Sequence, residues 1–360
     1  MNFNAIFLKS FRVLLLPFAI LYGIIIYLRN KLYDKNYLSS VDFNFPLICI
    51  GNLSVGGTGK SPMVEYLIRL LKDNYETGTI SRGYKRKTKG YVLATQNTTA
   101  LEIGDEPMQF HLKFPEVSVA VGEERLVAIP QLLQDKPNLQ TIILDDAFQH
   151  REVKAGFNIL LTDFNNLYTH DFYLPTGDLR DGTYSAKRAN VIIVTKCPED
   201  LTEHQQQNII RLLKPKSNQK VFFTTIMYGL PYHIANLQDK RMITLNDEVL
   251  LVCGIANPTP IKELLLQQAA TYYQKSYNDH HIFSIDDLTE IKEKFNNITT
   301  NSKFILTTEK DAVRLVKFSD ELKDLPMYVL PIKHEFLFDE ANIFNEMVIS
   351  FISNFNKEKA

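Results

Sequence analysis

Residues 54–61 (SVGGTGKS) have the composition of a phosphate-binding loop. Glycines let backbone N–H groups curl around an anion without obstruction by a Cβ atom, and a helix that Pro62 would open adds a positive dipole end. Lys60 can reach the β- and γ-phosphates of a nucleotide, and the Ser61 hydroxyl can bind Mg²⁺. The residues predicted to bind the nucleotide are Ser54, Val55, Gly56, Gly57, Thr58, Gly59, Lys60 and Ser61.

This loop departs from the strict pattern G-x-x-x-x-G-K-[ST], because Ser54 stands where the first glycine is expected. Gly56 and Gly57 lie inside the loop instead. The alternative is an ordinary glycine-rich turn without a ligand. Two extra glycines between a strand-like run and a helix favour phosphate binding.

Two adjacent carboxylates, Asp145 and Asp146, follow the apolar run 141–144. In a parallel sheet the carboxyl ends of the strands gather ligands at one edge, which would place these carboxylates beside the loop. One of them would hold Mg²⁺, directly or through water. The alternative is that both only cap the next turn, but neighbouring carboxylates repel each other unless a cation is near. The two motifs together predict magnesium-dependent nucleotide chemistry and leave hydrolysis, phosphoryl transfer and switching open.

Elements that alternate between strand and helix must position these groups. Continuous apolar runs, rather than strict alternation, are typical of strands covered on both faces, and therefore of a parallel sheet with helical crossovers. The predicted strands are 45–50, 117–121, 141–144, 157–161, 191–195 and 221–225, with helices at 62–71 and 123–133. A second alternation begins at residue 249 and ends with a helix over about 340–355.

The predicted fold is therefore α/β: a P-loop NTPase-like parallel sheet domain and a second, smaller α/β domain, joined by a β-ribbon and preceded by a membrane-anchor helix. The polar segment after residue 227 carries Gly229 and Pro231 and is interpreted as the ribbon. The predicted division is 1–36 for the membrane-associated helix, 37–227 for the nucleotide-binding domain, 228–248 for the ribbon and 249–360 for the C-terminal domain.

Composition excludes several classes of protein. Of the 360 residues 45% are apolar and 22% are charged, which excludes a disordered chain. The net charge of −1 offers no basic field for nucleic acid, so no nucleic-acid partner is expected. Cys49, Cys197 and Cys253 are far apart in apolar runs, which indicates neither a disulfide framework nor a zinc site and favours a reducing, cytosolic environment.

An uncharged segment over residues 13–28 lies between Arg12 and the pair Arg29 and Lys31. As a helix it would reach about 24 Å, short of the roughly 30 Å hydrocarbon core of a bilayer, and Pro17 would disturb it. A buried core helix is the alternative, and a cleaved signal peptide is disfavoured because no small-residue cleavage site follows. We favour a membrane anchor, interfacial or marginally spanning, with the rest of the chain on the cytoplasmic side.

Residues 82–89 (RGYKRKTK) hold five basic side chains. A solvated loop is the simpler interpretation, and the functional one is a patch for lipid phosphate and anionic headgroups, to which Tyr84 adds an amphipathic contact. Thr195 and Lys196 resemble the Thr-Lys pair of guanine-specific loops. Pro198 and Glu199 stand in place of the expected aspartate, which disfavours GTP.

Five segments are informative together: 51–62 (GNLSVGGTGKSP), 81–84 (SRGY), 104–107 (GDEP), 145–150 (DDAFQH) and 307–311 (TTEKD). They closely resemble the tetraacyldisaccharide 4′-kinase family, whose members phosphorylate the lipid A disaccharide precursor in Gram-negative bacteria. The resemblance extends from the apolar N-terminal segment to about Arg314.

This resemblance implies two α/β domains joined by a two-stranded ribbon, with the site between them, on the cytoplasmic face of the inner membrane. It implies ATP and Mg²⁺ as cofactors and a catalytic Asp–His pair, here Asp105 and His280, with His281 as the alternative histidine. Lys60 is the third predicted catalytic residue, and Ser61, Asp145 and Asp146 are the predicted magnesium ligands. The predicted substrate-binding residues are Arg82, Tyr84, Glu106, Gln149, His150 and Arg180.

Three positions depart from the family pattern. Asp181 replaces a glutamate after Arg180, Lys85 replaces a glycine, and Ala147 replaces another glycine. Taken without the resemblance, Asp105 and Glu106 are ordinary helix N-terminal charges, and either histidine is an ordinary surface residue.

The sequence thus predicts an ATP-dependent kinase for the 4′-hydroxyl of the tetraacyldisaccharide 1-phosphate, a glycolipid met at a membrane surface. A membrane-associated P-loop ATPase that acts as a switch or maturation factor is the alternative. A nucleic-acid motor is disfavoured by the charge balance. Acyl-chain number and oligomeric state stay open.

Overall fold

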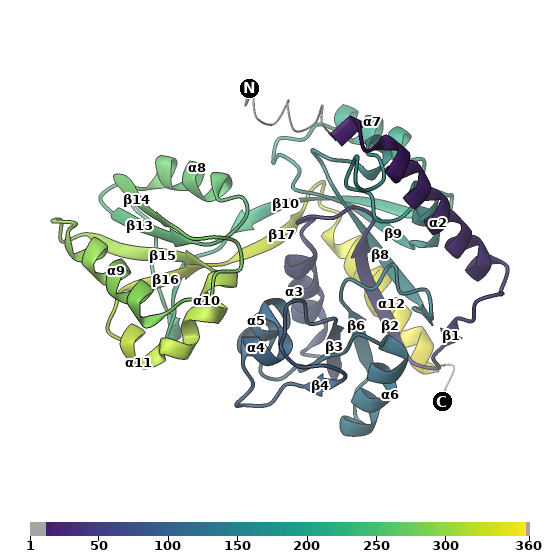
Figure 1. The fold of residues 1–360 in the computed structure, drawn as a ribbon, viewed down its shortest axis with the longest axis horizontal. Coiled ribbons are helices and arrows are strands. Elements are labelled where there is room, and N and C mark those ends of the chain that lie inside the picture. Colours follow the sequence, from purple (N-terminus) through teal and green to yellow (C-terminus); the bar gives the residue numbers. More distant parts are fainter. Residues whose placement is uncertain (1–11, 358–360) are drawn as a thin grey trace.

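The computed structural model describes residues 12–357 and contains two large sheets, each covered by helices (Figure 1). The first sheet has nine strands in the order β17-β10-β9-β8-β2-β6-β3-β5-β4. Seven of them run parallel, and only β4 and β17 pair in the antiparallel direction. In chain order these strands are Leu47–Asn52 (β2), Thr77–Ser81 (β3), Val92–Leu93 (β4), Ser118–Val121 (β5), Thr141–Leu144 (β6), Phe157–Asp163 (β8), Val191–Thr195 (β9), Lys220–Tyr228 (β10) and Ile332–Phe336 (β17).

Hydrophobic clusters cover both faces of this sheet, as continuous apolar strands require. Every residue of β2 is buried, and Leu47 and Ile48 belong to opposite clusters. The α-helices around the sheet are Lys60–Leu71 (α3), Ala100–Ile103 (α4), Asp105–Lys113 (α5), Arg125–Asp135 (α6), Glu203–Leu213 (α7) and Ala341–Lys357 (α12), with short 3₁₀ turns at Tyr168–His170 and Thr183–Arg188. A small separate ladder pairs Val41–Asp42 (β1) with Val153–Lys154 (β7).

The second sheet has six strands in the order β12-β11-β16-β15-β13-β14. Its central strands are parallel, and β11 pairs antiparallel with both neighbours. The strands are Tyr232–His233 (β11), Asn236–Lys240 (β12), Glu248–Cys253 (β13), Thr271–Ser276 (β14), Lys303–Thr308 (β15) and Met327–Leu330 (β16). The helices are Thr259–Gln268 (α8), Ile285–Asn296 (α9), Glu309–Leu315 (α10) and Ser319–Leu322 (α11), with a 3₁₀ turn at Val316–Phe318.

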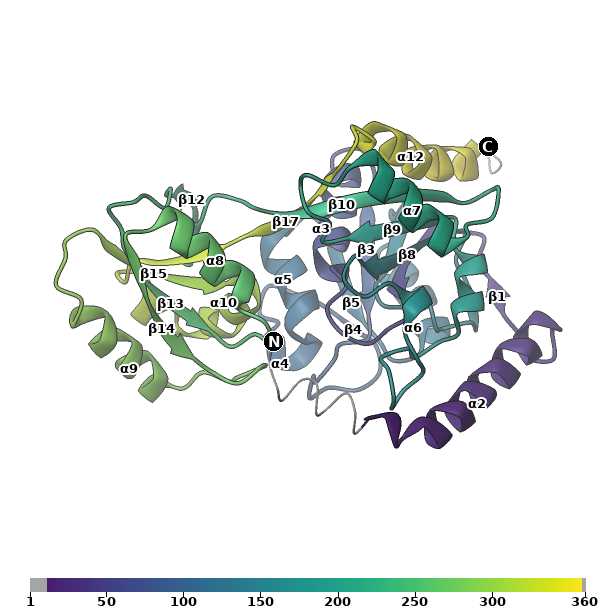
Figure 2. The ribbon, with the colours of Figure 1, turned by 90° about the horizontal axis from the view of Figure 1, so that it is seen from above.

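The ribbon that joins the two sheets is formed by β10 and β17, which run side by side between them (Figures 1 and 2). The sequence predicts the ribbon at 228–248 and the second domain at 249–360, and the structure distributes these segments differently. Within 228–248, β11 and β12 belong to the six-stranded sheet. At the other end, β17 and α12 return to the nine-stranded sheet, because Phe344, Val348 and Ile352 form a buried helical stripe in the same cluster as Ile48.

The N-terminal helix α2 spans Leu16–Asp34, and Pro17 lies in its first turn, where proline is tolerated. Figure 2 shows α2 and α12 on opposite sides of the nine-stranded part. Most apolar side chains of α2 are exposed, including Phe18, Ile24 and Ile25, so the alternative of a buried core helix is wrong. None of the helices within residues 12–357 is long and apolar enough to cross a bilayer. Residues 1–11 of the predicted segment lie outside the described residues.

Candidate active site

The loop predicted to bind phosphate connects β2 to α3, and two of its glycines have backbone conformations with positive φ. Gly56 and Gly59 have positive φ angles of 105° and 82°, which non-glycine residues rarely adopt. A Cβ atom built on Gly56 or Gly57 would meet no described atom within 4 Å, so this side of the loop is open. A Cβ atom on Gly59 would instead lie 2.9 Å from Nε2 of His334, so the loop is closely packed on its other side.

Two side chains hold the loop from that packed side. The Thr195 hydroxyl donates to the carbonyl of Thr58 at 2.9 Å and lies 3.2 Å from the carbonyl of Thr162. Nε2 of His334 lies 2.9 Å from the carbonyl of Gly59. Sequence reasoning missed His334 because β17 lies far along the chain and carries no motif.

Lys60 begins α3, and its ammonium is held at the mouth of the loop. Nζ donates to Oδ1 of Asn52 at 3.1 Å and lies 3.7 Å from Oδ1 of Asp146. The Asn52 carbonyl accepts from Nε2 of Gln149 at 2.7 Å, and Arg180 donates to Asn52 Oδ1. Gln149 and Arg180, both predicted to bind substrate, therefore brace the residue that orients Lys60.

Asp146 follows β6, and its negative charge is compensated by the positively charged side chains of Arg180 and Lys60. Arg180 binds both of its oxygens, with Nη1 to Oδ2 at 3.0 Å. Burial would raise the pKa of Asp146, but the hydrogen bonds from Arg180 and the charge of Lys60 outweigh it and lower the pKa to about 2. Of the predicted metal ligands, Asp146 is thus turned toward Arg180.

Asp145 is buried and has a different environment. The Ser81 hydroxyl donates to Oδ2 at 3.2 Å, while Oδ1 is buried without a hydrogen-bond partner among the described residues. Burial, followed by the charges of Glu106 and Asp146, raises the pKa of Asp145 to about 7. A buried carboxylate oxygen with no partner close to two other carboxylates is the environment that a cation would stabilise.

The side chains of Ser61, at the start of α3, and Glu106, at the start of α5, contact each other. The Ser61 hydroxyl donates to Oε1 of Glu106 at 2.9 Å, and Nζ of Lys310 reaches the same oxygen at 3.3 Å. Within residues 12–357 no three His, Cys, Asp or Glu side chains form a metal site by themselves. Mg²⁺ commonly takes one or two carboxylates and completes its shell with water and phosphate oxygens. Ser61, Asp145 and Glu106 fit that requirement.

Asp105 begins α5 and is contacted by two residues of the six-stranded part. Nδ1 of His280 lies 2.9 Å from Oδ2, and Nε of Arg314 donates to Oδ1 at 2.9 Å, with Nη2 on Oδ2. Burial would raise the pKa of Asp105, but the hydrogen bonds and charges of Arg314 and His280 outweigh it and lower the pKa. His281 instead bonds to Asp287 at the start of α9, so the structure brings His280, and not His281, to Asp105.

Arg314 was not predicted as a site residue. It ends the segment that resembles the kinase family, and this position was the only signal in the sequence. It lies on α10, which begins where Thr308 caps the helix by accepting a hydrogen bond from the Asp311 backbone N–H.

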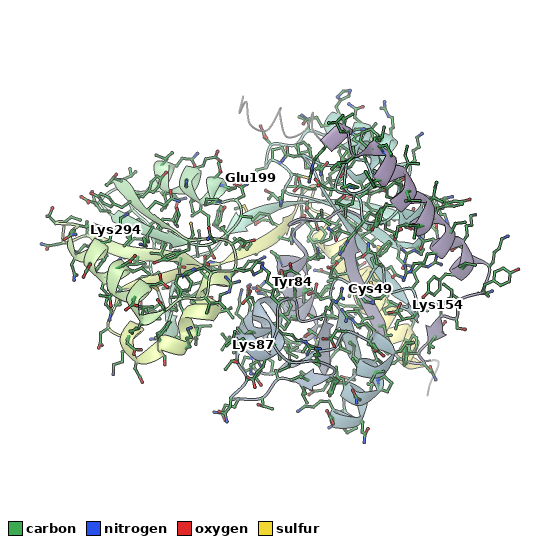
Figure 3. All side chains as sticks on the ribbon, in the orientation of Figure 1. Cys49, Tyr84, Lys87, Lys154, Glu199 and Lys294 are labelled. Carbon is green, nitrogen blue, oxygen red and sulfur yellow. The ribbon has the colours of Figure 1, made fainter. Side chains whose placement is uncertain are left out.

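The remaining predicted residues lie around the cluster. Tyr84 is exposed and its ring centroid is 5.8 Å from that of His280; Figure 3 shows Tyr84 on the side that faces the six-stranded part. The Arg82 side chain is exposed in the same loop. Nδ1 of His150 is paired with Glu152 at 2.9 Å rather than with the loop. Asp181 is buried and accepts from Asn30 of α2 and from Arg188.

Comparison with known proteins adds to this geometry. The family model described as tetraacyldisaccharide-1-P 4′-kinase matches residues 11–352. The tetraacyldisaccharide 4′-kinase of Bacteroides thetaiotaomicron is 45% identical over 352 residues, covering 94% of this chain and 92% of the relative. That of Flavobacterium johnsoniae is 46% identical over 341 residues, covering 95% and 97%. A crystal structure of LpxK from Aquifex aeolicus in complex with ATP matches 95% of this chain and 99% of its own with a TM-score of 0.74 and 27% identity.

Proposed function

The chain belongs to the tetraacyldisaccharide-1-P 4′-kinase family, and we propose that its two polar clusters, one around Lys60 and one around Asp105, divide the work of that reaction. The family confirms the predicted function, which is ATP- and Mg²⁺-dependent phosphorylation of the 4′-hydroxyl of the lipid A precursor. The predicted ATPase switch is therefore set aside. We propose that the nine-stranded part holds the nucleotide and that residues 229–331 form the second domain.

The Lys60 cluster is assigned to the nucleotide. The open side of the loop at Gly56 and Gly57 accepts the phosphates, and backbone N–H groups at the start of α3 donate to them. Lys60, oriented by Asn52, places its charge at the β- and γ-phosphates.

The magnesium ligands in this proposal are Ser61, Asp145 and Glu106. The buried, unpartnered Oδ1 of Asp145 supports this assignment. When bound, Mg²⁺ neutralises charge on the β- and γ-phosphates and helps to align them. Asp146 takes a different role from the predicted one, because its pairing with Arg180 and Lys60 suits a residue that holds the Lys60 ammonium in place.

The Asp105 cluster is assigned to the acceptor. A carboxylate oxygen of Asp105 takes the proton of the 4′-hydroxyl while the hydroxyl oxygen bonds to the γ-phosphorus. The bond between the γ-phosphorus and the β-phosphate oxygen breaks, and ADP leaves with that oxygen. His280 orients Asp105 and shares the charge. Oδ2 of Asp105 is bound by both His280 and Arg314, whereas Oδ1 accepts one hydrogen bond from Arg314 and keeps a lone pair for the acceptor hydroxyl. The observation that carries the assignment is that Asp105, on α5, is contacted by both His280 and Arg314 from the other part.

The test compares Asp105→Asn with Lys60→Ala. Asp105→Asn is expected to lower kcat by roughly 100-fold or more, because the base is lost while the nucleotide cluster is intact. Lys60→Ala is expected to abolish transfer and to weaken ATP binding. The measurements are phosphorylation of the disaccharide 1-phosphate lipid and equilibrium binding of ATP. An equal loss of ATP binding in Asp105→Asn would contradict the division.

We also propose that the protein acts at the cytoplasmic face of the inner membrane through α2, lying in the interface. The exposed apolar side chains of α2, Phe18, Ile24 and Ile25 among them, support this placement. Replacing Ile24 and Ile25 together with Asp should reduce cosedimentation with phosphatidylglycerol vesicles at least fivefold, while the far exposed pair Leu245 and Leu266, replaced in the same way, serves as control. Unchanged sedimentation of the α2 variant would exclude α2 as the contact.

A further inference from the structure

His334 lies beneath the phosphate loop but belongs to β17, the second strand of the ribbon between the two sheets. Its side chain is 3% exposed. Nε2 contacts the carbonyl of Gly59 at 2.9 Å, and Nδ1 contacts the hydroxyl of Thr224 on β10 at 2.9 Å. The imidazole therefore connects both strands of the ribbon to the loop.

The partners fix the tautomer of this histidine. A carbonyl oxygen only accepts, so Nε2 carries the proton and donates to Gly59. Nδ1 is then unprotonated and accepts from the Thr224 hydroxyl. Burial lowers the pKa of His334 to about 4, so the ring stays neutral at physiological pH.

This hydrogen bond determines where a loop N–H points. In a trans peptide the carbonyl and the N–H point in opposite directions. With the Gly59 carbonyl held against His334, the N–H of Lys60 in the same peptide unit is directed away from His334. Thr195 acts in the same way on the preceding unit, holding the carbonyl of Thr58 and directing the N–H of Gly59.

We propose that His334 is a positioning residue of the ATP site, which keeps the peptide between Gly59 and Lys60 in the orientation that binds phosphate. The close approach adds to the positive φ angle as a reason for glycine at position 59, since a Cβ atom there would lie 2.9 Å from Nε2 of His334. The inference rests on the proposed function in one respect, namely that residues 54–61 bind the phosphates of ATP.

A buried histidine that only stabilises the fold is the alternative, and the chain provides a matched example of one. His233 on β11 is also buried, and its Nε2 lies 2.9 Å from the carbonyl of Leu325 while its Nδ1 accepts from the backbone N–H of Ala235. It makes the same kinds of hydrogen bond within the six-stranded sheet. Removing His233 should therefore lower the stability of the protein by the loss of a buried, hydrogen-bonded histidine, without any effect on the loop at residues 54–61.

The experiment uses full-length protein and the variants His334→Leu, His334→Gln and His233→Leu. His334→Leu removes the donor, and His334→Gln places an amide N–H close to the position of Nε2. For each variant the Kd for ATP is measured in EDTA, together with the KM for ATP, the KM for the lipid, kcat and the Tm. The first measurement does not depend on Mg²⁺ or on transfer.

His334→Leu is expected to raise the Kd and the KM for ATP roughly tenfold, the scale of one lost hydrogen bond to a buried carbonyl, while the KM for the lipid changes less than twofold. His334→Gln should recover most of this loss. His233→Leu should lower the Tm but leave the Kd for ATP within twofold of the wild-type value.

A folded His334→Leu protein that binds ATP as tightly as the wild type would overturn the proposal, as would His334→Gln and His334→Leu proteins with equal defects. If His334→Leu does not fold, Thr195→Val tests the companion hydrogen bond, and an unchanged Kd for ATP in that variant counts against the positioning role. Lys60→Ala distinguishes a failure of the proposed nucleotide site from a failure of the role of His334. If Lys60→Ala binds ATP normally, the assignment of residues 54–61 to the nucleotide fails. If Lys60→Ala has weakened ATP binding and His334→Leu does not, only the role of His334 is rejected.

Discussion

Three aspartates of the site have different electrostatic environments although two of them are adjacent in sequence. Asp105 and Asp146 are each bound by an arginine, and their pKa values are lowered. Asp145 has one hydroxyl partner and a raised pKa. Groups with opposite shifts in one site are suited to different tasks, which agrees with the proposed roles of a paired base, a brace for Lys60 and a cation ligand.

Arg314 gives a prediction at this scale. We expect Arg314→Gln to lower kcat roughly 10- to 100-fold, because Asp105 and His280 lose the group that fixes their relative position, while the KM for ATP changes less than threefold. Steady-state kinetics with varied ATP and varied lipid measure both values. The control is Arg241→Gln, which removes a guanidinium paired with Asp247 in the six-stranded sheet and should leave kcat unchanged. A loss of the same size in both variants would argue against a role for Arg314 at the site.

The sequence predicted the residues of this site that belong to motifs. The loop, its glycine positions and Asp145 were predictable because phosphate binding restricts residue type and spacing together, whereas Asp105 was predicted only through the family resemblance. Arg314 and His334 could not, because their contacts with Asp105 and Gly59 cross more than 200 residues of sequence, and such contacts leave no local pattern.

At the scale of elements, α2 shows how a predicted apolar helix is attached through polar groups. Nδ2 of Asn30, which is 1% exposed, donates to Oδ1 of Asp181 at 2.7 Å, and Arg151 donates to the carbonyl of Asn30 at 2.8 Å. The Tyr22 hydroxyl donates to the carbonyl of Arg180 at 3.0 Å, so the helix also touches the segment that binds Asp146. The shorter side chain at position 181, which left its role open in the sequence, thus forms a buried anchor for α2.

We predict that Asn30→Ala lowers the free energy of unfolding by about 1–3 kcal/mol, since a buried carboxylate oxygen loses a donor. The loss should be accompanied by faster proteolysis within α2. Chemical denaturation and limited proteolysis measure the two effects. Leu28→Ala, on the exposed face of the same helix, should stay within about 0.5 kcal/mol of the wild type. Equal stability of the two variants would show that Asn30 does not anchor the helix.

At the scale of the whole molecule, polar side chains along α5 join the nine-stranded part to the six-stranded part. Asp105 and Glu106 contact Arg314 and Lys310, and farther along the helix Lys113 binds both Glu65 of α3 and Glu309 of α10. One ammonium thus serves two buried carboxylates. Burial, followed by the charge of Glu65, raises the pKa of Glu309 to about 7.

This raised pKa predicts how stability depends on pH. Its value of about 7 in the folded protein exceeds the value of about 4.3 expected for the unfolded chain. The folded state therefore binds the proton more tightly, so the contribution of Glu309 to stability is complete below about pH 4.3 and is lost as the pH rises through about 7. Relative to the wild type, Glu309→Gln should gain stability as the pH rises from about 4.3 to about 7, and the difference should level off above that, as measured by urea denaturation. The exposed Glu335→Gln is the control, and a difference that does not change with pH would contradict the prediction.

Both alternations of strand and helix were predictable from the sequence, and the connection between the two sheets was not. Apolar runs identify buried strands, but they do not tell which strand pairs with which. The pairing of β17 with β10 and the return of α12 depend on partners more than a hundred residues away, such as Phe336 opposite Thr224.

The register of the ribbon places Tyr228 directly opposite Ile332. The chain therefore leaves the nine-stranded sheet and re-enters it at a single point, and residues 229–331 are an insertion between the paired strands β10 and β17. An insertion at such a point changes neither the strand order nor the core of its host. Exchanging this inserted segment between relatives at these two positions would therefore replace His280 and Arg314, the proposed partners of Asp105, and would leave the strands and the loop of the nine-stranded part in place.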